Sequence, residues 1–540
     1  MTMIRARRLP APALLVLCFL TLLAPPAAAA GAQDHGHPEG DPFTLGDVDF
    51  PVSCTPAAAA RFETAVAALH SFWFEAAERG FQEVAAADPS CAMAHWGLAM
   101  TYLGNPMARV APGAERMALG RAAAERARAL AGAASHREQM YADAVVAYYE
   151  DEARDHATRS GDHERAMGAL HGAHPDDMEA AIFYARAVVA NAPPSDLTFS
   201  RQILGAELMQ PLFEGHPNHP GLAHYLIHAY DAPALAARGE KAAFAYADIA
   251  PSAPHALHMP SHIFTRLGYW DASIETNARS AQAEPVPDAA VHPMDYMVYA
   301  YLQQGRDGEA KRIVQRAVEN SDRFYGGIMG YNFAAMPARF ALERGDWAAA
   351  AAQRVPTGAP AFVEAIPRFA RAIGAARAGR LGDAREETAA LGRLHTVLVE
   401  QGDAYWATLV KAQRLAAESW AAHLAGNDAS ALLLAREAAE LEETVEKHPV
   451  TPGPLLPARE LQGDLLMELG RHAEALEAYA ATLEREPRRA RALYGAARAA
   501  ELAGRPVEAR GHYEALLEVM AGADDTRAEP KAARRFLGKG

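Results

Sequence analysis

The chain has 540 residues, of which 50% are hydrophobic and 22% are charged, and its formal net charge is -15. This length exceeds one ordinary hydrophobic core, so it indicates several domains or a repeat array. The negative charge argues against nucleic acid and anionic membrane surfaces as partners, because both require clustered positive charge.

The first 32 residues have the pattern of a secretory signal peptide. Arginines precede an apolar run over 11–23, and two small-residue cleavage sequences follow, at 28–30 and 30–32. We therefore expect residues 1–32 to be removed and the mature chain to lie in the periplasm or outside the cell. The alternative is an uncleaved first helix that anchors the chain. No later segment has the roughly 20 apolar residues of a membrane span, so none is expected after cleavage.

Residues 33–55 are polar and rich in glycine and proline at their start, which predicts a flexible leader. Of the three cysteines, Cys54 and Cys91 remain after cleavage. In an oxidising compartment they predict a disulfide. The alternative is two separate buried thiols.

The composition favours helix throughout, because alanine is abundant while valine, isoleucine and threonine are sparse. Residues 56–110 are predicted to form helix pairs, stopped near Gly104 to Pro106. Residues 111–215 continue as helices with a weak repeat signal. The fold class expected is all-α.

Residues 216–340 are rich in histidine, and seven of the 22 histidines of the chain fall between 216 and 262. On a helix that begins near Pro220, the side chains of His224, His228 and Asp231 lie on one stripe. Two imidazoles and a carboxylate on one face predict half of a metal site.

His258 and His262 flank a proline at the start of another predicted helix, and they are candidates for the other half of this site. The metal would be zinc, copper or iron, with Asp231 as a ligand or as a partner of one. In the alternative interpretation the histidines cap helices and pack against tyrosines. Further candidates for outer partners or for a ligand groove are His255, His292, Tyr296, Tyr331 and Asn332.

The C-terminal part, 341–522, contains the clearest repeat. Gly470, Ala475, Tyr479 and Leu483 recur 34 residues later as Gly504, Ala509, Tyr513 and Leu517. This period and these positions resemble the tetratricopeptide repeat family. The resemblance implies a right-handed superhelical solenoid of antiparallel helix pairs, degenerate in the middle. The acidic run 440–446 is interpreted as a solvated helix face, and residues 523–540 as a charged tail.

The histidine segment also resembles exported bacterial proteins that contain tetratricopeptide repeats. Their pattern is an H-x-x-x-H helix followed by H-M-P-S-H-I-F-x-R-L-G-x-W, which here covers His224 to His228 and His258 to Trp270. This resemblance implies no particular reaction.

Two functions remain open at the level of sequence. The repeats favour a scaffold that binds a protein or peptide in the cell envelope. The histidines favour a metalloprotein, in which case the metal would serve as a Lewis acid or redox centre. No serine hydrolase elbow, phosphate-binding loop or dinucleotide fingerprint accompanies either one.

Overall fold

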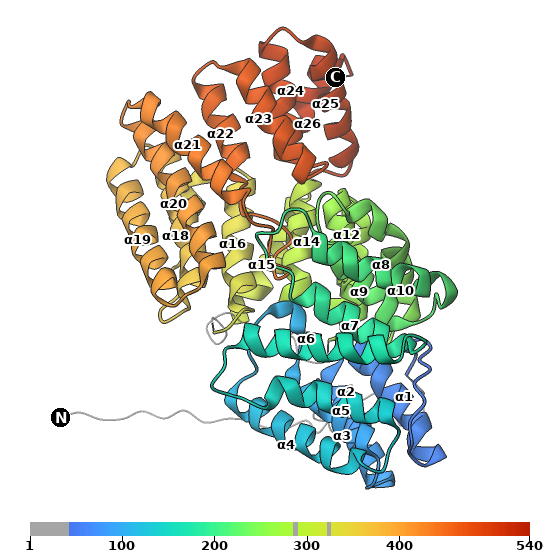
Figure 1. Cartoon of the computed structure of the whole chain (residues 1–540). Helices are drawn as coiled ribbons and strands as arrows, with labels where there is room; N and C mark the ends of the chain where they lie inside the picture. The colour runs from blue at the N-terminus through green and yellow to red at the C-terminus, as the bar shows by residue number, and fades with distance from the viewer. Residues whose placement is uncertain (1–42, 285–289, 321–325, 540) are drawn as a thin grey trace, which may run out of the picture. The chain divides into compact units, whose positions relative to one another are not determined.

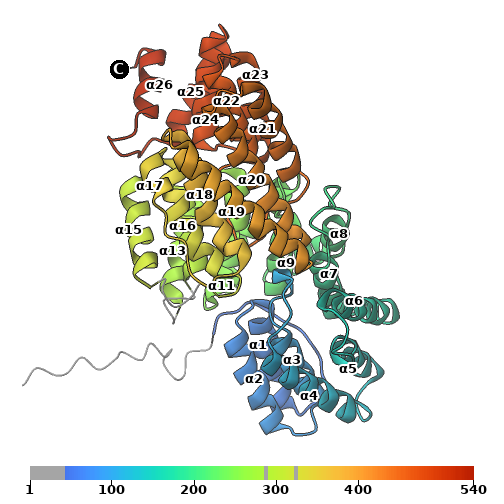
Figure 2. The ribbon, with the colours of Figure 1, turned by 90° about the vertical axis from the view of Figure 1, so that its left-hand side faces the viewer.

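The computed structural model describes residues 43–284, 290–320 and 326–539, and all regular secondary structure within them is helical. Consecutive helices pack against one another in chain order (Figures 1 and 2). The prediction of an all-α helical solenoid is confirmed. The predicted signal peptide lies outside the described residues. Among the described helices, none combines the length and the apolar character that crossing a bilayer requires.

The N-terminal helices form the first part of the solenoid. They are α1 (Pro56–His70), α2 (Phe74–Ala87), α3 (Ala92–Leu103), the 3-10 helix η1 (Pro106–Ala108), α4 (Ala114–Ala131), α5 (His136–Tyr149), α6 (His156–Ala173), α7 (Met178–Ala190), α8 (Ser200–Gly215) and α9 (Pro220–Tyr230).

The middle helices are mostly shorter, and two of them begin with proline. They are the 3-10 helix η2 (Ala236–Gly239), α10 (Glu240–Ile249), α11 (Pro254–His258), α12 (Pro260–Leu267), α13 (Trp270–Ala283), α14 (Val291–Gln303), α15 (Asp307–Asn320) and α16 (Gly330–Glu343).

The C-terminal helices return to regular pairs. They are α17 (Trp347–Ala351), α18 (Ala361–Arg377), α19 (Leu381–Glu400), α20 (Ala404–Leu424), α21 (Asp428–Glu442), α22 (Ala458–Glu468), α23 (His472–Arg485), α24 (Ala490–Leu502), α25 (Pro506–Val519) and α26 (Glu529–Leu537).

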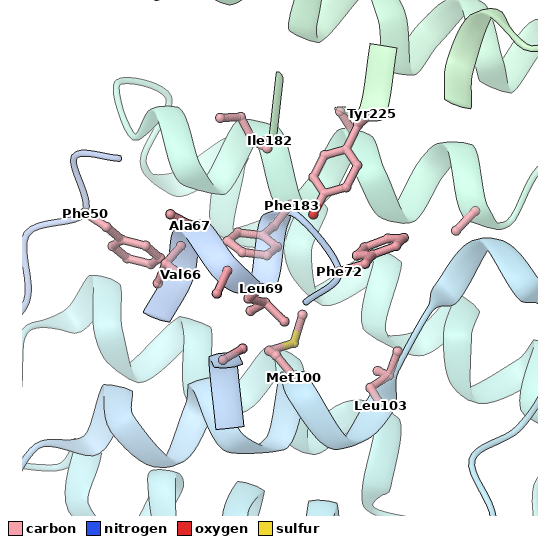
Figure 3. Packing of buried hydrophobic residues seen from close by; sticks show 14 of the residues in the cluster. Phe50, Val66, Ala67, Leu69, Phe72, Met100, Leu103, Ile182, Phe183 and Tyr225 are labelled. Carbon is pink, nitrogen blue, oxygen red and sulfur yellow. The ribbon is translucent and has the colours of Figure 1, made fainter. Parts of the chain in front are cut away.

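The segment 43–55 belongs to the predicted flexible leader, but it packs against the N-terminal helices instead. Phe50 is fully buried, and its ring centroid lies 5.3 Å from that of Phe62 and 5.6 Å from that of Trp96. Figure 3 shows Phe50 beside α1. The free energy gained by burying this aromatic side chain holds the segment against the helices, although the segment begins with polar residues. Cys54 and Cys91 lie at disulfide distance, with their Cα atoms 5.1 Å apart.

The 34-residue repeat has a clear structural basis near the C-terminus. Gly470 and Gly504 end their helices with φ of +70° and +73°, a conformation that favours glycine. Tyr479 packs between α22 and α24, where a Cβ atom on Gly495 would lie 2.4 Å from its ring. The small residue therefore allows the helices to approach.

The connection between α21 and α22, residues 443–457, runs beside the middle helices (Figure 1). The backbone N–H of Glu446 donates to the carbonyl of Pro194, and the Asn332 amide donates to the carbonyl of Val450. This connection brings charged residues from the C-terminal half next to the histidine segment.

Candidate metal centre

Three histidines from α9 and α11 converge on one point. Nε2 of His224 lies 3.1 Å from Nε2 of His228 and 3.2 Å from Nε2 of His255. His224 and His228 are one helical turn apart on α9, whereas Pro254 begins the short helix α11 that carries His255. These three residues are called the first triad.

Three further histidines, from α11, α12 and α14, form a second triad. Nε2 of His258 lies 3.0 Å from Nε2 of His262. The ring centroid of His292 lies 4.4 Å from that of His258. One possible ligand atom from each of the three lies within 4.8 Å of the others. Nδ1 of His292 is buried without a hydrogen-bond partner in the described part of the chain.

The two triads lie side by side. His255 and His258 are on the same short helix, with ring centroids 6.1 Å apart, and the rings of His228 and His262 are 5.9 Å apart. The sequence suggested one site with ligands from two segments. The structure instead divides the residues into two neighbouring sites, in which His255 and His292 are full members.

Hydrogen bonds fix the tautomer of three of these histidines. Nδ1 of His224 donates to the carbonyl of His70 at 2.6 Å, and Nδ1 of His262 donates to the Asp231 carboxylate at 2.8 Å. Nδ1 of His258 faces Oδ1 of Asn277 at 2.6 Å. A carbonyl or carboxylate can only accept, so each Nδ1 carries the hydrogen and each neutral ring has a lone pair on Nε2.

The orientation of the Asn277 amide is fixed independently. Its Nδ2 donates to the carbonyl of Ser273 at 2.6 Å, so its Oδ1 must face His258. Two Nε2 lone pairs, on His258 and His262, then face each other at 3.0 Å. Such lone pairs cannot hydrogen-bond to each other, and a cation between them is the natural partner.

The spacing of the nitrogens fits a metal ion. An ion with about 2.0 to 2.1 Å bonds to imidazole and tetrahedral angles holds its ligand nitrogens about 3.3 to 3.4 Å apart. The Nε2 separations of 3.0 to 3.2 Å are close to this value. Burial lowers the pKa of all six histidines, that of His258 to about 3, and in five of them neighbouring imidazoles add to this effect. For His262, Asp231 opposes the effect of burial on the pKa. The rings are therefore neutral and able to coordinate.

Asp231, a predicted ligand, lies outside both triads. Besides His262, its carboxylate contacts Arg266 at 2.9 Å and Lys447 at 3.0 Å. Burial alone would raise the pKa of Asp231, but Lys447, Arg266 and the His262 hydrogen bond hold it well below its usual range. Asp231 thus orients a possible ligand and balances charge.

Residues from the N-terminal helices complete the surroundings of the first triad. Phe72 stacks on His255 with ring centroids 5.3 Å apart and contacts His224 at 4.4 Å. Its φ of +51° is unusual for a bulky residue, and such strain is concentrated at functional sites.

A third cluster, His70, Glu179 and His219, lies behind the first triad. Nε2 of each histidine donates to the Glu179 carboxylate at 2.9 Å, while Tyr225 contacts Nδ1 of His70 at 3.1 Å. The backbone N–H of Leu222 donates to Nδ1 of His219. All four ring nitrogens already have hydrogen-bond partners, so this cluster is a poor metal site as arranged. Its hydrogen bonds hold His70 in place, and the carbonyl of His70 in turn accepts from His224.

The other residues predicted as outer partners or as parts of a ligand groove have different surroundings. The Tyr296 hydroxyl is 3.3 Å from Nδ1 of His262 and also reaches the carbonyl of Thr451, so it is an outer partner. Asn332 belongs to a buried network with Asp295 instead of a groove. Tyr331 lines a separate cavity.

A cavity lies beside the first triad. It reaches His228 and Asp231, includes Arg109 and Lys447 in its wall, and measures about 640 Å³ with its mouth. A small molecule could therefore approach the first triad from this side. Glu446, from the acidic run predicted as a solvated face, also lines the cavity and pairs with Arg266 at 3.0 Å. The prediction that Glu446 is on a solvated helix face is wrong, because the connection between α21 and α22 folds inward.

The fold and the histidine triads define a helical-repeat protein with a possible metal centre in its middle helices. A family model described as tetratricopeptide repeat matches residues 461–528, so the chain contains tetratricopeptide repeats. Such repeats generally mediate contacts between proteins.

Comparison with solved structures gives weak similarity. A human IFIT1 dimer with PPP-AAAA is 12% identical and covers 87% of this chain and 92% of that chain, at a TM-score of 0.38. A human IFIT1 dimer with m7Gppp-AAAA is 13% identical and covers 89% and 92%, also at 0.38. Similarity of this degree supports no conclusion about a ligand. No curated protein sequence matches the chain significantly.

Proposed function

We propose that the chain is an exported metalloprotein that holds two transition-metal ions side by side, one in each histidine triad. The observation that carries this proposal is the convergence of Nε2 atoms at 3.0 to 3.2 Å in both triads, with two lone pairs facing each other between His258 and His262. Export is supported by the signal sequence and by the two cysteines at disulfide distance.

Copper is the metal that the surroundings favour. Both triads are composed of imidazoles without a carboxylate, and among divalent first-row metals copper binds such nitrogen sites most tightly. The nearest charged groups are Asp231 with Arg266 and Lys447, which together add no negative charge to balance two dications. Two Cu(I) ions bring half the charge of two divalent ions and therefore suit this environment better.

The corresponding role is oxidation and reduction. Two Cu(I) ions, held by the first and second triads, would supply one electron each to a two-electron oxidant such as dioxygen. The cavity beside His228 provides a route for such a small oxidant.

Metal stoichiometry tests the proposal. The full chain, stripped of metal and then loaded anaerobically with Cu(I) or aerobically with Zn²⁺, should bind two ions by native mass spectrometry and elemental analysis. His228→Ala and His262→Ala should each leave one ion. His216→Ala is the matched control, because His216 is exposed in the same histidine-rich segment. Binding that is unaffected by both triad substitutions would refute the proposal. Tighter retention of zinc than copper would refute the metal assignment alone.

Protein or peptide binding is a second candidate, supported by the tetratricopeptide repeats at 461–528. Leu502 and Val507 are 47% and 83% exposed there, so apolar side chains remain available for contact. Charged substitutions at both positions should abolish capture of an envelope partner while copper binding is unchanged. Capture that survives these substitutions would contradict a contact at this surface.

A further inference from the structure

An aromatic cavity lies between α16, α18, α20 and the connection 443–457. Phe362 stacks on Trp406 with ring centroids 4.8 Å apart, and Tyr331 lies 5.4 Å from the same indole. Tyr405 and Phe369 extend the wall. The space that these side chains enclose, with its mouth, is about 970 Å³. Concave, mainly apolar sites of this kind accommodate one small organic molecule.

Most charged side chains around this cavity are already paired. Arg459 binds the Glu443 carboxylate at 2.9 Å through Nε. Lys447 binds Asp231 and Glu446 binds Arg266, as described above. Arg485 and Glu486 also line the cavity; Arg485 lies 3.6 Å from Glu446, and Glu486 accepts a hydrogen bond from Tyr299. These pairings leave little free charge for a ligand.

Glu442 is the exception. Its Oε1 accepts one backbone hydrogen bond from Ala458 at 2.8 Å, and no basic side chain of the described residues forms a salt bridge with it. Burial raises its pKa to about 7, and the nearby carboxylates of Glu443 and Glu486 add to this effect, against the influence of Arg485. Its carboxylate would be stabilised by a cation.

Two other acceptors in the wall lack donors. Oε1 of Gln413 is buried, and no hydrogen-bond donor of the described residues reaches it. Oε2 of Glu446 is also buried, and Nη2 of Arg485 forms an ion pair with it at 3.6 Å, which is beyond hydrogen-bond distance. Unsatisfied buried acceptors cost free energy unless a ligand or water supplies the missing donor. An occupant of the cavity should therefore bring N–H groups.

We propose that this cavity binds a small organic ammonium ion that carries a flat apolar group. The apolar group packs among Phe362, Tyr405 and Trp406, where an aromatic face also attracts positive charge. The ammonium group binds the Glu442 carboxylate and supplies hydrogens to the neighbouring acceptors. Asp231, Arg266 and Lys447 belong to the layer between this cavity and the second triad, so the occupant does not contact the metal ligands.

Isothermal titration of the full chain with matched probes tests this inference. 2-Phenylethylamine should bind, whereas 2-phenylethanol, which lacks the charge, and butylamine, which lacks the ring, should each bind at least about tenfold more weakly. This comparison uses the wild-type chain, so it does not depend on the folding of a variant. Equal affinity for amine and alcohol, or no binding of the amine at millimolar concentration, would overturn the inference.

Substitutions then locate the site. Glu442→Gln should weaken amine binding about tenfold or more and remove the preference for the amine over the alcohol. Trp406→Leu should weaken both ring-bearing probes. Glu440→Gln is the matched control, since Glu440 is exposed on the same helix and pairs with Arg436. Copper stoichiometry should remain unchanged in all three variants, so failure of this inference is distinguishable from failure of the metal proposal. Unchanged amine binding in Glu442→Gln would overturn it.

Discussion

Replacing Asp231 by asparagine should destabilise the chain and weaken one metal site only. The carboxylate lies 2.9 Å from Nε of Arg266 and 3.0 Å from Nζ of Lys447, and the three side chains are 3 to 6% exposed. Asparagine keeps the shape but removes the charge that balances these cations. Breaking a buried ion pair by removal of one partner costs about 3 to 5 kcal/mol, and we expect a loss in this range.

The same substitution removes the anionic acceptor of the His262 ring. Loss of such an outer partner typically reduces metal affinity about 10- to 100-fold. The second triad should therefore bind its ion more weakly, whereas the first triad, which the carbonyl of His70 orients, should be unaffected.

A double-mutant cycle measures the charge effect separately. Urea unfolding of the metal-free chain, followed by circular dichroism at neutral pH, should show Asp231→Asn,Lys447→Met to be more stable than Asp231→Asn alone, by about 1 to 3 kcal/mol. Removing Lys447 as well leaves fewer unbalanced cations. Asp383→Asn, on an exposed face of α19, should change stability by less than about 0.5 kcal/mol. Equal stability of the single and double variants, or equal weakening of both ions, would refute the reasoning.

Three further predictions concern other parts of the chain. Glu442→Gln should stabilise the protein by about 3 kcal/mol at pH 8, with the difference vanishing near pH 4. Between pH 4 and pH 8 the folded carboxyl, with a pKa of about 7, binds more protons than the unfolded one, so the stability of the wild type falls as the pH rises. A stability difference in urea unfolding that does not depend on pH would contradict this. Asn277→Leu should remove the acceptor that fixes the His258 tautomer and lower the metal affinity of the second triad alone by about 10- to 100-fold. Competition with a chelator measures this affinity, and an equal loss at both triads would exclude this role of Asn277. Gly495→Ala should lower the free energy of unfolding by about 1 to 3 kcal/mol, because the new Cβ would lie 2.4 Å from the Tyr479 ring. Thermal or urea unfolding measures this, and metal stoichiometry should remain unchanged. Unchanged stability would show that the ring moves freely.

The repeats near the C-terminus could be predicted from sequence because their cause is local. Gly470 and Gly504 mark turns by their own backbone preference, and the 34-residue spacing identifies Ala475 and Tyr479 as contacts between neighbouring helices. His224 and His228 are likewise on one face of a single helix, so periodicity suffices to place them together.

The rest of the site depends on contacts between distant segments, and the spacing of residues along the sequence does not predict such contacts. His255 and His258 are three positions apart, yet each enters a different triad, because α11 ends after one turn and a new helix begins at Pro260. His292 joins only because α14 packs against α12 and α13. The inward path of the connection carrying Lys447 has no signature in the sequence beyond charge.

The distribution of outer partners explains why a solenoid suits such a centre. The histidines of the triads come from α9, α11, α12 and α14. Their orientation depends on the His70 carbonyl from α1, on Asn277 from α13 and, through Asp231, on Lys447 from the connection between α21 and α22. Each helix pair contacts its neighbours, so a repeat array can align these groups without one large core. The strained Phe72 backbone and the buried Asp231 cluster both cost stability, and costs of this kind are retained at functional sites. The proposed metal site is thus a property of the assembled array, because a peptide with the six histidines alone would lack the partners that fix the tautomers of His224, His258 and His262.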